Sequence, residues 1–334
     1  MNDVAGAGQL GVLLQDPQVT DVLVNGVQVW VDRGQGLVRA PITMSSGDQV
    51  RRLAQRLAAA CGRRLDDGMP FVDARLSDGS RLHAVLPPIA TAGPYLSVRT
   101  FRLRARPLAE LVSAQLAELL AAIVEARLSF LIAGGTGSGK TTLLNAMLGA
   151  VSSRERIVLV EDAAELSPAH PHVVGLQSRL SNVEGVGSVG LSELVRQALR
   201  MRPDRLVVGE CRGAELAELL CALNTGHDGG ASTIHANGSA DVPTRLEALG
   251  LLGGVPLAAL RAQIAAAFQV VLQLRRGPAG RELAEVSTLI RSGADGVVVT
   301  CPIWSQREGV GLAAPQFSRA LVAHGVAVPG WFRP

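Results

Sequence analysis

The sequence almost lacks lysine. Of its 32 basic residues, 31 are arginine, and Lys140 is the one lysine. A lysine ammonium is a compact point charge on a flexible stem, and it fits among phosphate oxygens where the planar fork of an arginine does not. Composition alone therefore makes Lys140 the first candidate functional residue.

Aromatic residues and net charge are also scarce. The 334 residues include one Tyr, three Trp and six Phe, and the formal net charge is +3. Proteins that bind single-stranded nucleic acid combine a positively charged groove with aromatic stacking platforms. The composition therefore gives no support for direct nucleic-acid binding.

The sequence has neither paired cysteines nor a long apolar run. Its four cysteines are scattered and show no C-x-x-C spacing, so we expect no cysteine zinc site and no thioredoxin-like chemistry. The most apolar stretch, 246–274, is interrupted by Glu247 and Arg261, so we expect no membrane-spanning helix. The first residues do not have the pattern of a secretory signal. The expected location is therefore the cytoplasm.

The N-terminal part of the chain has the pattern of a small α+β domain, and the length suggests a second domain after it. Strand-like segments alternate with turn residues, and one segment has the apolar spacing of a helix. The strand-like segments are 22–31, which contains an Asn25-Gly26 turn, 71–76, 81–86 and 95–101, and the helical segment is 46–61. We expect residues 1–101 to form an α+β domain with one antiparallel sheet.

A basic, proline-ended segment at 102–107 is expected to be a linker, and beyond it strands alternate with helices. The strand-like segments are 130–133, 157–160 and 206–208, and the helical segments are 116–127, 140–149 and 191–199. This alternation is typical of a parallel α/β sheet. We expect residues 108–334 to form an α/β domain with a mainly parallel sheet and a C-terminal tail.

A glycine-rich loop with the pattern G-x-x-x-x-G-K-[ST] joins the strand at 130–133 to a helix. The loop residues are Gly134, Gly135, Thr136, Gly137, Ser138, Gly139, Lys140 and Thr141, followed by Thr142. In this context the backbone N–H groups and the helix N-terminus surround a triphosphate. We expect Lys140 to reach the β- and γ-phosphates and Thr141 to ligate Mg²⁺. A dinucleotide fingerprint is excluded, because the third glycine of G-x-G-x-x-G is missing.

The expected nucleotide is ATP. An Asn-Lys-x-Asp element for guanine recognition would need a further lysine, and a protein kinase needs a lysine on a strand ahead of its catalytic loop. The sequence has neither, and it also lacks the Leu-Ser-Gly-Gly-Gln segment of ABC transporter subunits. The sequence therefore argues against these three classes.

Carboxylates follow two of the predicted strands. Glu161, Asp162 and Glu165 come after 157–160, and Glu210 comes after 206–208. Open α/β sheets bind ligands at the carboxyl ends of their strands, so both positions suit a Walker B carboxylate. An acidic residue at such a place can also cap a following helix, and that reading stays open.

Two histidines, His227 and His235, flank a further strand-like segment. Their spacing and the lack of a third ligand argue against a zinc site. A single histidine is usually structural, so the pattern alone leaves the role of His235 undecided.

Together these motifs resemble the Walker A, Asp box, Walker B and His box of the type II/type IV secretion ATPase superfamily. The matching segments are 134–142, 160–166, 200–213 and 225–237. The segment 73–81 and the Arg245-Leu-Glu after the His box are most similar to the CpaF-like ATPases of the tight-adherence (Tad) pilus branch. The resemblance covers roughly residues 10 to 290. The sequence lacks the four-cysteine zinc module of the general secretory ATPases.

The resemblance implies a RecA-like P-loop ATPase domain that binds ATP and Mg²⁺. It also implies a homo-oligomer, a hexameric ring, which drives pilus assembly or secretion through an inner-membrane platform protein. The subunit would then be cytoplasmic and peripherally associated with the inner face of the membrane. No direct contact with nucleic acid is expected.

The resemblance also suggests roles for single residues. Glu210 would orient or deprotonate water and share Mg²⁺ with Thr141, and His235 would sense the γ-phosphate. Glu161 and Glu165 are further catalytic candidates. Arginines of the N-terminal domain reach the triphosphate in this family, and the matching positions here are Arg81 and Arg99, with Arg75 as a weaker third.

Three other functions stay open at this point. A nucleic-acid motor of the RecA or helicase type would share the same core, although it should have more aromatic residues near its arginines. A conjugation-type secretion ATPase uses the same motifs. A scaffold that binds ATP without hydrolysing it would also retain the glycine-rich loop.

Overall fold

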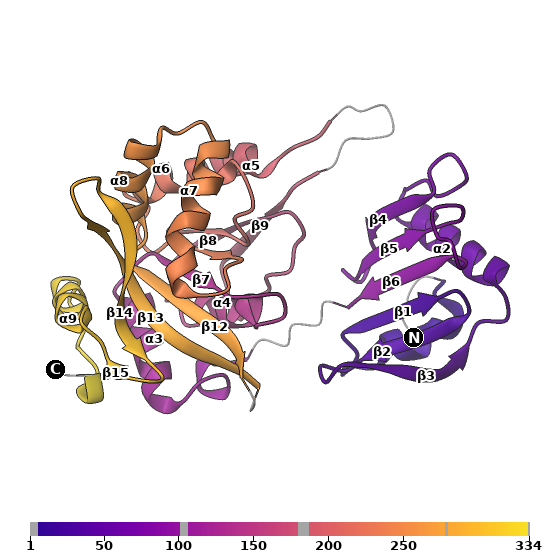
Figure 1. Ribbon diagram of the computed structural model, residues 1–334, viewed down its shortest axis with the longest axis horizontal. Helices are drawn as coiled ribbons and strands as arrows, with labels where there is room; N and C mark the ends of the chain where they lie inside the picture. The colour runs from indigo at the N-terminus through magenta and orange to yellow at the C-terminus, as the bar shows by residue number, and fades with distance from the viewer. Residues whose placement is uncertain (1–5, 101–105, 180–186, 278–279, 333–334) are drawn as a thin grey trace. The chain divides into compact units, whose positions relative to one another are not determined.

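The computed structural model describes residues 6–100, 106–179, 187–277 and 280–332. The chain divides into two compact units, Met1–Arg102 and Leu103–Pro334, and each has a sheet of its own (Figure 1). Most of the predicted linker, 102–107, lies outside the described residues.

The N-terminal unit contains a six-stranded antiparallel sheet with the order β3-β2-β1-β6-β5-β4. Its strands are β1 (Asp21–Asn25), β2 (Gln28–Asp32), β3 (Leu37–Thr43), β4 (Phe71–Arg75), β5 (Arg81–Val85) and β6 (Tyr95–Arg99), and its helices are η1 (Gly8–Leu10), α1 (Gly11–Gln15) and α2 (Gly47–Ala60). The hydroxyl of Ser46 caps α2 by accepting from the N–H of Gln49. The predicted antiparallel sheet and helix are therefore confirmed.

The first hairpin turns one residue later than predicted. Asn25 pairs with Gln28, so the two central turn residues are Gly26 and Val27 and not Asn25 and Gly26. Gly26 has a φ of 61°, a left-handed conformation that glycine adopts without steric cost. The glycine thus sits at the first central position, as in type II′ hairpins.

The larger unit contains a nine-stranded mixed sheet with the order β15-β14-β13-β12-β7-β11-β10-β8-β9. Its strands are β7 (Phe130–Ala133), β8 (Ile157–Glu161), β9 (Val173–Gln177), β10 (Arg205–Val208), β11 (Ala231–Ile234), β12 (Val270–Gly277), β13 (Gly280–Ser292), β14 (Val297–Ser305) and β15 (Gly309–Val310). The run from β12 to β9 is parallel, and β13 to β15 extend it in antiparallel fashion. The α/β fold class with a mainly parallel second sheet is therefore confirmed.

Helices cover both faces of this sheet. Neighbouring strand residues point to opposite faces, and both sets are apolar, so each face packs against helices. In β7, Phe130 and Ile132 belong to one hydrophobic cluster, and Leu131 and Ala133 belong to the other. The first cluster includes residues of α3 (Ala114–Glu125), α4 (Lys140–Gly149) and α9 (Ala314–Ala323), and the second includes residues of α5 (Leu191–Leu199), α6 (Glu215–Leu223), α7 (Val242–Leu252) and α8 (Leu257–Ala267). The remaining short helices are η2 (Leu108–Glu110), η3 (Ser239–Asp241) and η4 (Gly330–Phe332).

The predicted C-terminal tail is an ordered part of the larger unit. It supplies β14, β15 and α9, and Phe332 packs edge-to-face on Phe317 of α9 with ring centroids 5.7 Å apart. Both rings belong to the hydrophobic cluster that contains α3 and α4. In the described part of the chain, no helix has the length and apolarity needed to cross a membrane.

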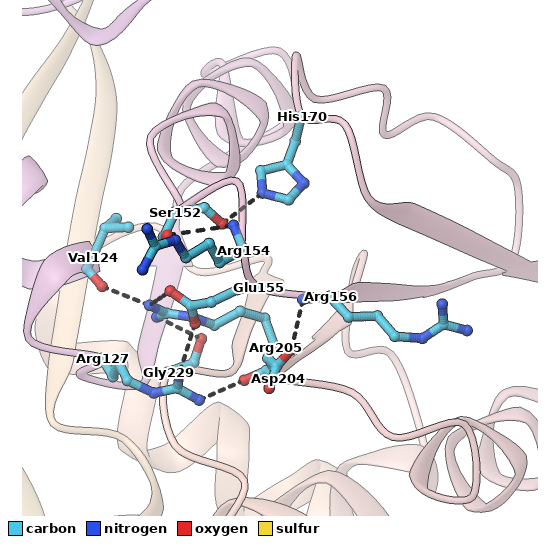
Figure 2. A network of polar contacts seen from close by, with 10 residues as sticks. All are labelled: Val124, Arg127, Ser152, Arg154, Glu155, Arg156, His170, Asp204, Arg205 and Gly229. Carbon is cyan, nitrogen blue, oxygen red and sulfur yellow. Dashed lines mark hydrogen bonds and ion pairs between the residues drawn. The ribbon is translucent and has the colours of Figure 1, made fainter.

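An ion network ties the amino ends of the parallel strands together (Figure 2). Arg205, which begins β10 and is 2% exposed, pairs with Glu155 at 2.7 Å. Its guanidinium also donates to the carbonyl of Val124 at the end of α3 (2.8 Å) and to that of Gly229 before β11 (3.4 Å). Arg127 donates to the same Glu155 at 2.6 Å. The network therefore fixes the starts of β10 and β11, whose far ends carry candidate functional residues.

Candidate nucleotide-binding site

Three predicted motifs follow strands that end at the same edge of the larger sheet. β11 lies between β7 and β10, and Ile234 at its end pairs with Ala133 at the end of β7. On the other side, the N–H of Cys211 donates to the carbonyl of Thr233 at 2.9 Å. The glycine-rich loop after β7, His235 after β11 and Glu210 after β10 therefore share this edge.

The first glycine of the loop is required by close packing. A Cβ on Gly134 would lie 2.5 Å from Oγ of Ser138 and 2.8 Å from the carbonyl oxygen of Leu274. Gly139, which precedes α4, has a left-handed φ of 99° that favours glycine. The loop conformation therefore depends on glycine at both positions.

The ammonium of Lys140 lies across its own loop. Its Nζ donates to the carbonyls of Gly134 at 2.8 Å and Gly135 at 3.0 Å. Burial lowers the pKa of Lys140, while the nearby carboxylate of Glu210 partly offsets this effect and the Arg212 guanidinium adds to it. Lys140, Glu210 and Arg212 are thus close enough to interact electrostatically.

Glu210 pairs with an arginine two residues away. Arg212 donates to its Oε2 from Nε at 2.8 Å and from Nη2 at 2.5 Å. This hydrogen bond is the main reason that the pKa of Arg212 is raised, and the carboxylates of Asp162 and Glu165 contribute further. The structure therefore brings the two predicted acidic strand ends together around Arg212, a residue that the sequence did not single out.

Glu161 is buried and holds the turn that follows β8. It is 5% exposed, and its Oε1 accepts from the N–H groups of Glu165 at 2.9 Å and Leu166 at 3.0 Å. A Cβ on Gly209 would lie 2.9 Å from Cγ of Glu161, so the ends of β8 and β10 are in close contact. Glu161 thus has a clear structural task beside the strand end that carries Glu210.

The helix-capping reading of the acidic residues does not apply to Asp162 or Glu210. Within the described segment 106–179, the element after Asp162 is strand β9 and not a helix, and Oδ1 of Asp162 accepts from the hydroxyl of Ser178 at 3.1 Å. The helix after Glu210 is preceded by a turn that Glu215 holds, since its Oε1 accepts from the N–H groups of Arg212 (2.5 Å) and Gly213 (2.8 Å). Neither Asp162 nor Glu210 therefore caps a helix in the described part of the chain.

The residues at this edge fit a magnesium ion bound together with phosphate. Among the described residues no group of three or more His, Cys, Asp or Glu side chains could hold a metal ion by itself. Mg²⁺ is usually held by one or two carboxylates plus substrate phosphates. Thr141, in the first turn of α4, and Glu210, after β10, carry side-chain oxygen atoms of the kind that Mg²⁺ takes as ligands. His235 is exposed just beyond β11.

The predicted arginines of the N-terminal unit lie in one row across its sheet. Arg75 pairs with Arg81, and Arg81 pairs with Arg99, at directly opposite positions of β4, β5 and β6. The carboxylate of Asp73 forms an ion pair with Arg81, including a hydrogen bond to Nε at 3.0 Å. The strand register thus places three like charges side by side on one face, which the spacing along the sequence did not reveal.

Comparison with known proteins identifies the family. A family model described as "Type II/IV secretion system protein" matches residues 4–297. The chain is 56% identical over 321 residues to "Putative conjugal transfer protein Rv3659c" of Mycobacterium tuberculosis (strain ATCC 25618 / H37Rv), which covers 92% of this chain and 91% of the relative. It is 32% identical over 289 residues to conjugal transfer protein TrbB of Rhizobium radiobacter, which covers 83% of this chain and 86% of that protein.

A similar fold occurs in the ATPase DotB of Legionella pneumophila, with a TM-score of 0.59 and 17% identity over 99% of this chain and 96% of that one. At this identity the likeness concerns the fold alone. The residues that the family model matches include all the motifs at the edge of the larger sheet. The chain therefore belongs to the type II/IV secretion system protein family.

Proposed function

We propose that this protein is an ATP-hydrolysing motor subunit of a pilus or secretion system. The observation that carries the proposal is that Lys140 of the glycine-rich loop lies at the same edge of a parallel sheet as Glu210 and Arg212, which follow β10. This edge is where open α/β sheets bind their ligands. Family membership supports the same conclusion.

Binding of ATP would replace the internal contacts of Lys140. Its ammonium would exchange the carbonyls of Gly134 and Gly135 for β- and γ-phosphate oxygens, and charge-assisted hydrogen bonds of this kind are stronger than neutral ones. The phosphate charge would also favour the protonated lysine, against the effect of burial. The backbone N–H groups of the loop would hold the remaining phosphate oxygens.

Hydrolysis would depend on position and electrostatics more than on covalent chemistry. Glu210 would accept a proton from water as the water oxygen bonds to the γ-phosphorus and the bond to the β–γ bridging oxygen breaks. Lys140 would stabilise the charge that develops on the leaving phosphate. Mg²⁺, held through Thr141 and Glu210, would supply further charge stabilisation. Glu161 and Glu165 would shape the adjoining turn, and His235 would sense the γ-phosphate.

The assembly is expected to be a hexameric ring, cytoplasmic and attached peripherally to the inner membrane through a platform protein. Arg81 and Arg99 would then act on the nucleotide as γ-phosphate contacts. The segment 73–81 favours the tight-adherence pilus branch, whereas the names of the two relatives favour a conjugation-type secretion ATPase. Identification of the membrane protein that co-purifies with this chain would decide between the branches.

Steady-state phosphate release tests the activity itself. The proposal predicts Mg²⁺-dependent hydrolysis of ATP that stops when EDTA is added. Tight ATP binding without phosphate release would support an assembly scaffold. Strong stimulation by single-stranded DNA would support a nucleic-acid motor. Light scattering with and without nucleotide would test the expected hexamer.

A further inference from the structure

A cavity adjoins the end of the glycine-rich loop inside the larger unit. Its volume is about 280 Å³, and its lining includes Gly139 and Thr142 at the start of α4, Leu111 and Val112 after η2, and Arg281 of β13. Small-molecule pockets range from about 300 to 1,000 Å³, so this cavity has room for part of a nucleotide. Its lining omits the residues expected at the β- and γ-phosphates, Lys140 and Thr141. It therefore suits the other end of the nucleotide.

The side chain of Arg281 covers the loop at this point. Its Cδ lies 3.3 Å from the place that a Cβ on Gly139 would occupy. In the described part of the chain its guanidinium has no hydrogen bond or ion pair, and the residue is exposed. Because Gly139 immediately precedes α4, Arg281 brings a free cation to a helix N-terminus in a phosphate-binding loop.

The strand register sets a second arginine opposite the first. Arg276 of β12 pairs directly with Arg281 of β13. Like charges directly opposite each other in an antiparallel pair repel and destabilise it. An anion placed between or beside the two guanidinium groups would remove this cost. The hairpin therefore carries an unbalanced positive charge next to the glycine-rich loop.

The carboxylates of the cavity are already engaged by other partners. Glu282 accepts from Arg275 at 2.5 Å and from Gln306 at 3.0 Å, and the Arg275 hydrogen bond lowers its pKa. Glu110 accepts from Arg106 at 3.1 Å. These contacts fix the hairpin and the short helix η2. Of the two described arginines that line the cavity, Arg106 and Arg281, they leave Arg281 available to an incoming anion.

We propose that Arg281 binds the α-phosphate of the nucleotide and that the cavity takes its nucleoside. The apolar side chains of Leu111 and Val112 then lie against the base, and the loop holds the other two phosphates. This inference rests on the proposed ATP-binding function. It adds a nucleotide-binding residue from the β12–β13 hairpin, outside the predicted motifs.

Calorimetric titration of the full chain with MgADP tests the role of Arg281. Hydrogen bonds to charged groups contribute enough that Arg281→Ala should weaken ADP binding about tenfold or more, and Arg281→Lys should fall between this variant and the wild type because it keeps the charge and loses the fork. Arg291→Ala is the matched control, since Arg291 is an exposed arginine near the other end of the same strand. Wild-type affinity in Arg281→Ala would overturn the proposal.

A second variant tests the nucleoside cavity. Val112→Trp should fill the cavity, so ADP binding should be lost while binding of inorganic pyrophosphate, which needs only the loop, should remain. Circular dichroism and thermal unfolding check that this variant is folded. If it is not folded, the titration of Arg281→Ala with MgADP tests the proposal instead. Unchanged ADP affinity in folded Val112→Trp would place the nucleoside elsewhere.

The outcomes separate this inference from the proposed function. If the wild type binds neither ADP nor pyrophosphate, the proposed function fails. If the wild type binds ADP, Lys140→Ala does not, and Arg281→Ala binds like the wild type, then only the inference about Arg281 is wrong.

Discussion

Arg212 holds the carboxylate of Glu210 through two hydrogen bonds to one oxygen, Oε2. The pair is asymmetric in exposure, because the arginine side chain is 61% exposed and that of the glutamate 27%. Oε1 of Glu210 takes no part in this pair. Arg212 therefore restrains the carboxylate and leaves outside the pair Oε1, the oxygen that the proposed function would use on water.

Replacement of the proposed base should separate binding from turnover. Glu210→Gln keeps the shape of the side chain and removes its basicity, so it should retain ATP and lower kcat by about 10²-fold or more. Glu161→Gln is the comparison, since an amide oxygen can still accept the two backbone N–H groups that Glu161 holds. If Glu161→Gln or Glu165→Gln proves more severe, the base belongs to the turn after β8.

Loss of Arg212 should affect catalysis through the position of Glu210. We expect Arg212→Ala to bind ATP with nearly wild-type affinity and to lose about tenfold to 10²-fold in kcat, because small displacements of a reacting group are costly. Arg212→Lys should recover part of the rate. Separate measurement of kcat and KM is the check, and a change confined to KM would assign Arg212 to substrate binding instead.

The arginine row of the N-terminal unit should distinguish ATP from ADP. Arg81→Ala and Arg99→Ala are expected to fold normally, bind ADP nearly as well as the wild type, and lose most of their affinity for a non-hydrolysable ATP analogue, since a guanidinium can contact two γ-phosphate oxygens. Arg39→Ala, at an exposed position of β3 in the same sheet, is the control. Calorimetry with both nucleotides decides the matter, and equal losses for both would exclude a γ-phosphate contact.

The buried network should make Arg205 important for stability. Arg205→Met removes the guanidinium that joins Glu155 to Val124 and Gly229, and removal of one partner of a buried ion pair costs about 3–5 kcal/mol of unfolding free energy. Arg196, whose ion pairs with Glu193 and Glu218 lie at the surface, provides the control, because exposed pairs contribute little. Urea unfolding measures both, and an Arg205→Met variant as stable as Arg196→Ala would contradict this account.

The sequence predicted the glycine-rich loop and its flanking elements well, because these depend on local pattern. An apolar strand, the glycines and a helix follow one another within a few residues, and the structure has β7 and α4 at the predicted bounds. The Asn25-Gly26 turn was placed one residue early, since the register and not the dipeptide sets the hairpin.

Other features depend on contacts between distant segments and could not be predicted. The role of Arg212 requires Glu210, Asp162 and Glu165 to meet at one edge, and Arg281 reaches the loop only through the β12–β13 hairpin. The ordered C-terminal strands and α9 likewise bury their apolar side chains against segments far away in the sequence. The one local signal available for Arg212 was its place two residues after Glu210, inside the segment 200–213.

Phosphate release by the wild type and by Lys140→Ala is the most direct test of the central claim. No other lysine exists to supply the charge at the loop, and an arginine does not fit the same place, so both Lys140→Ala and Lys140→Arg should lose ATP hydrolysis. Purified wild type with Mg²⁺ should release phosphate from ATP, and neither variant should do so above background. Wild-type turnover in Lys140→Ala would contradict the assignment of the loop as the catalytic phosphate-binding site.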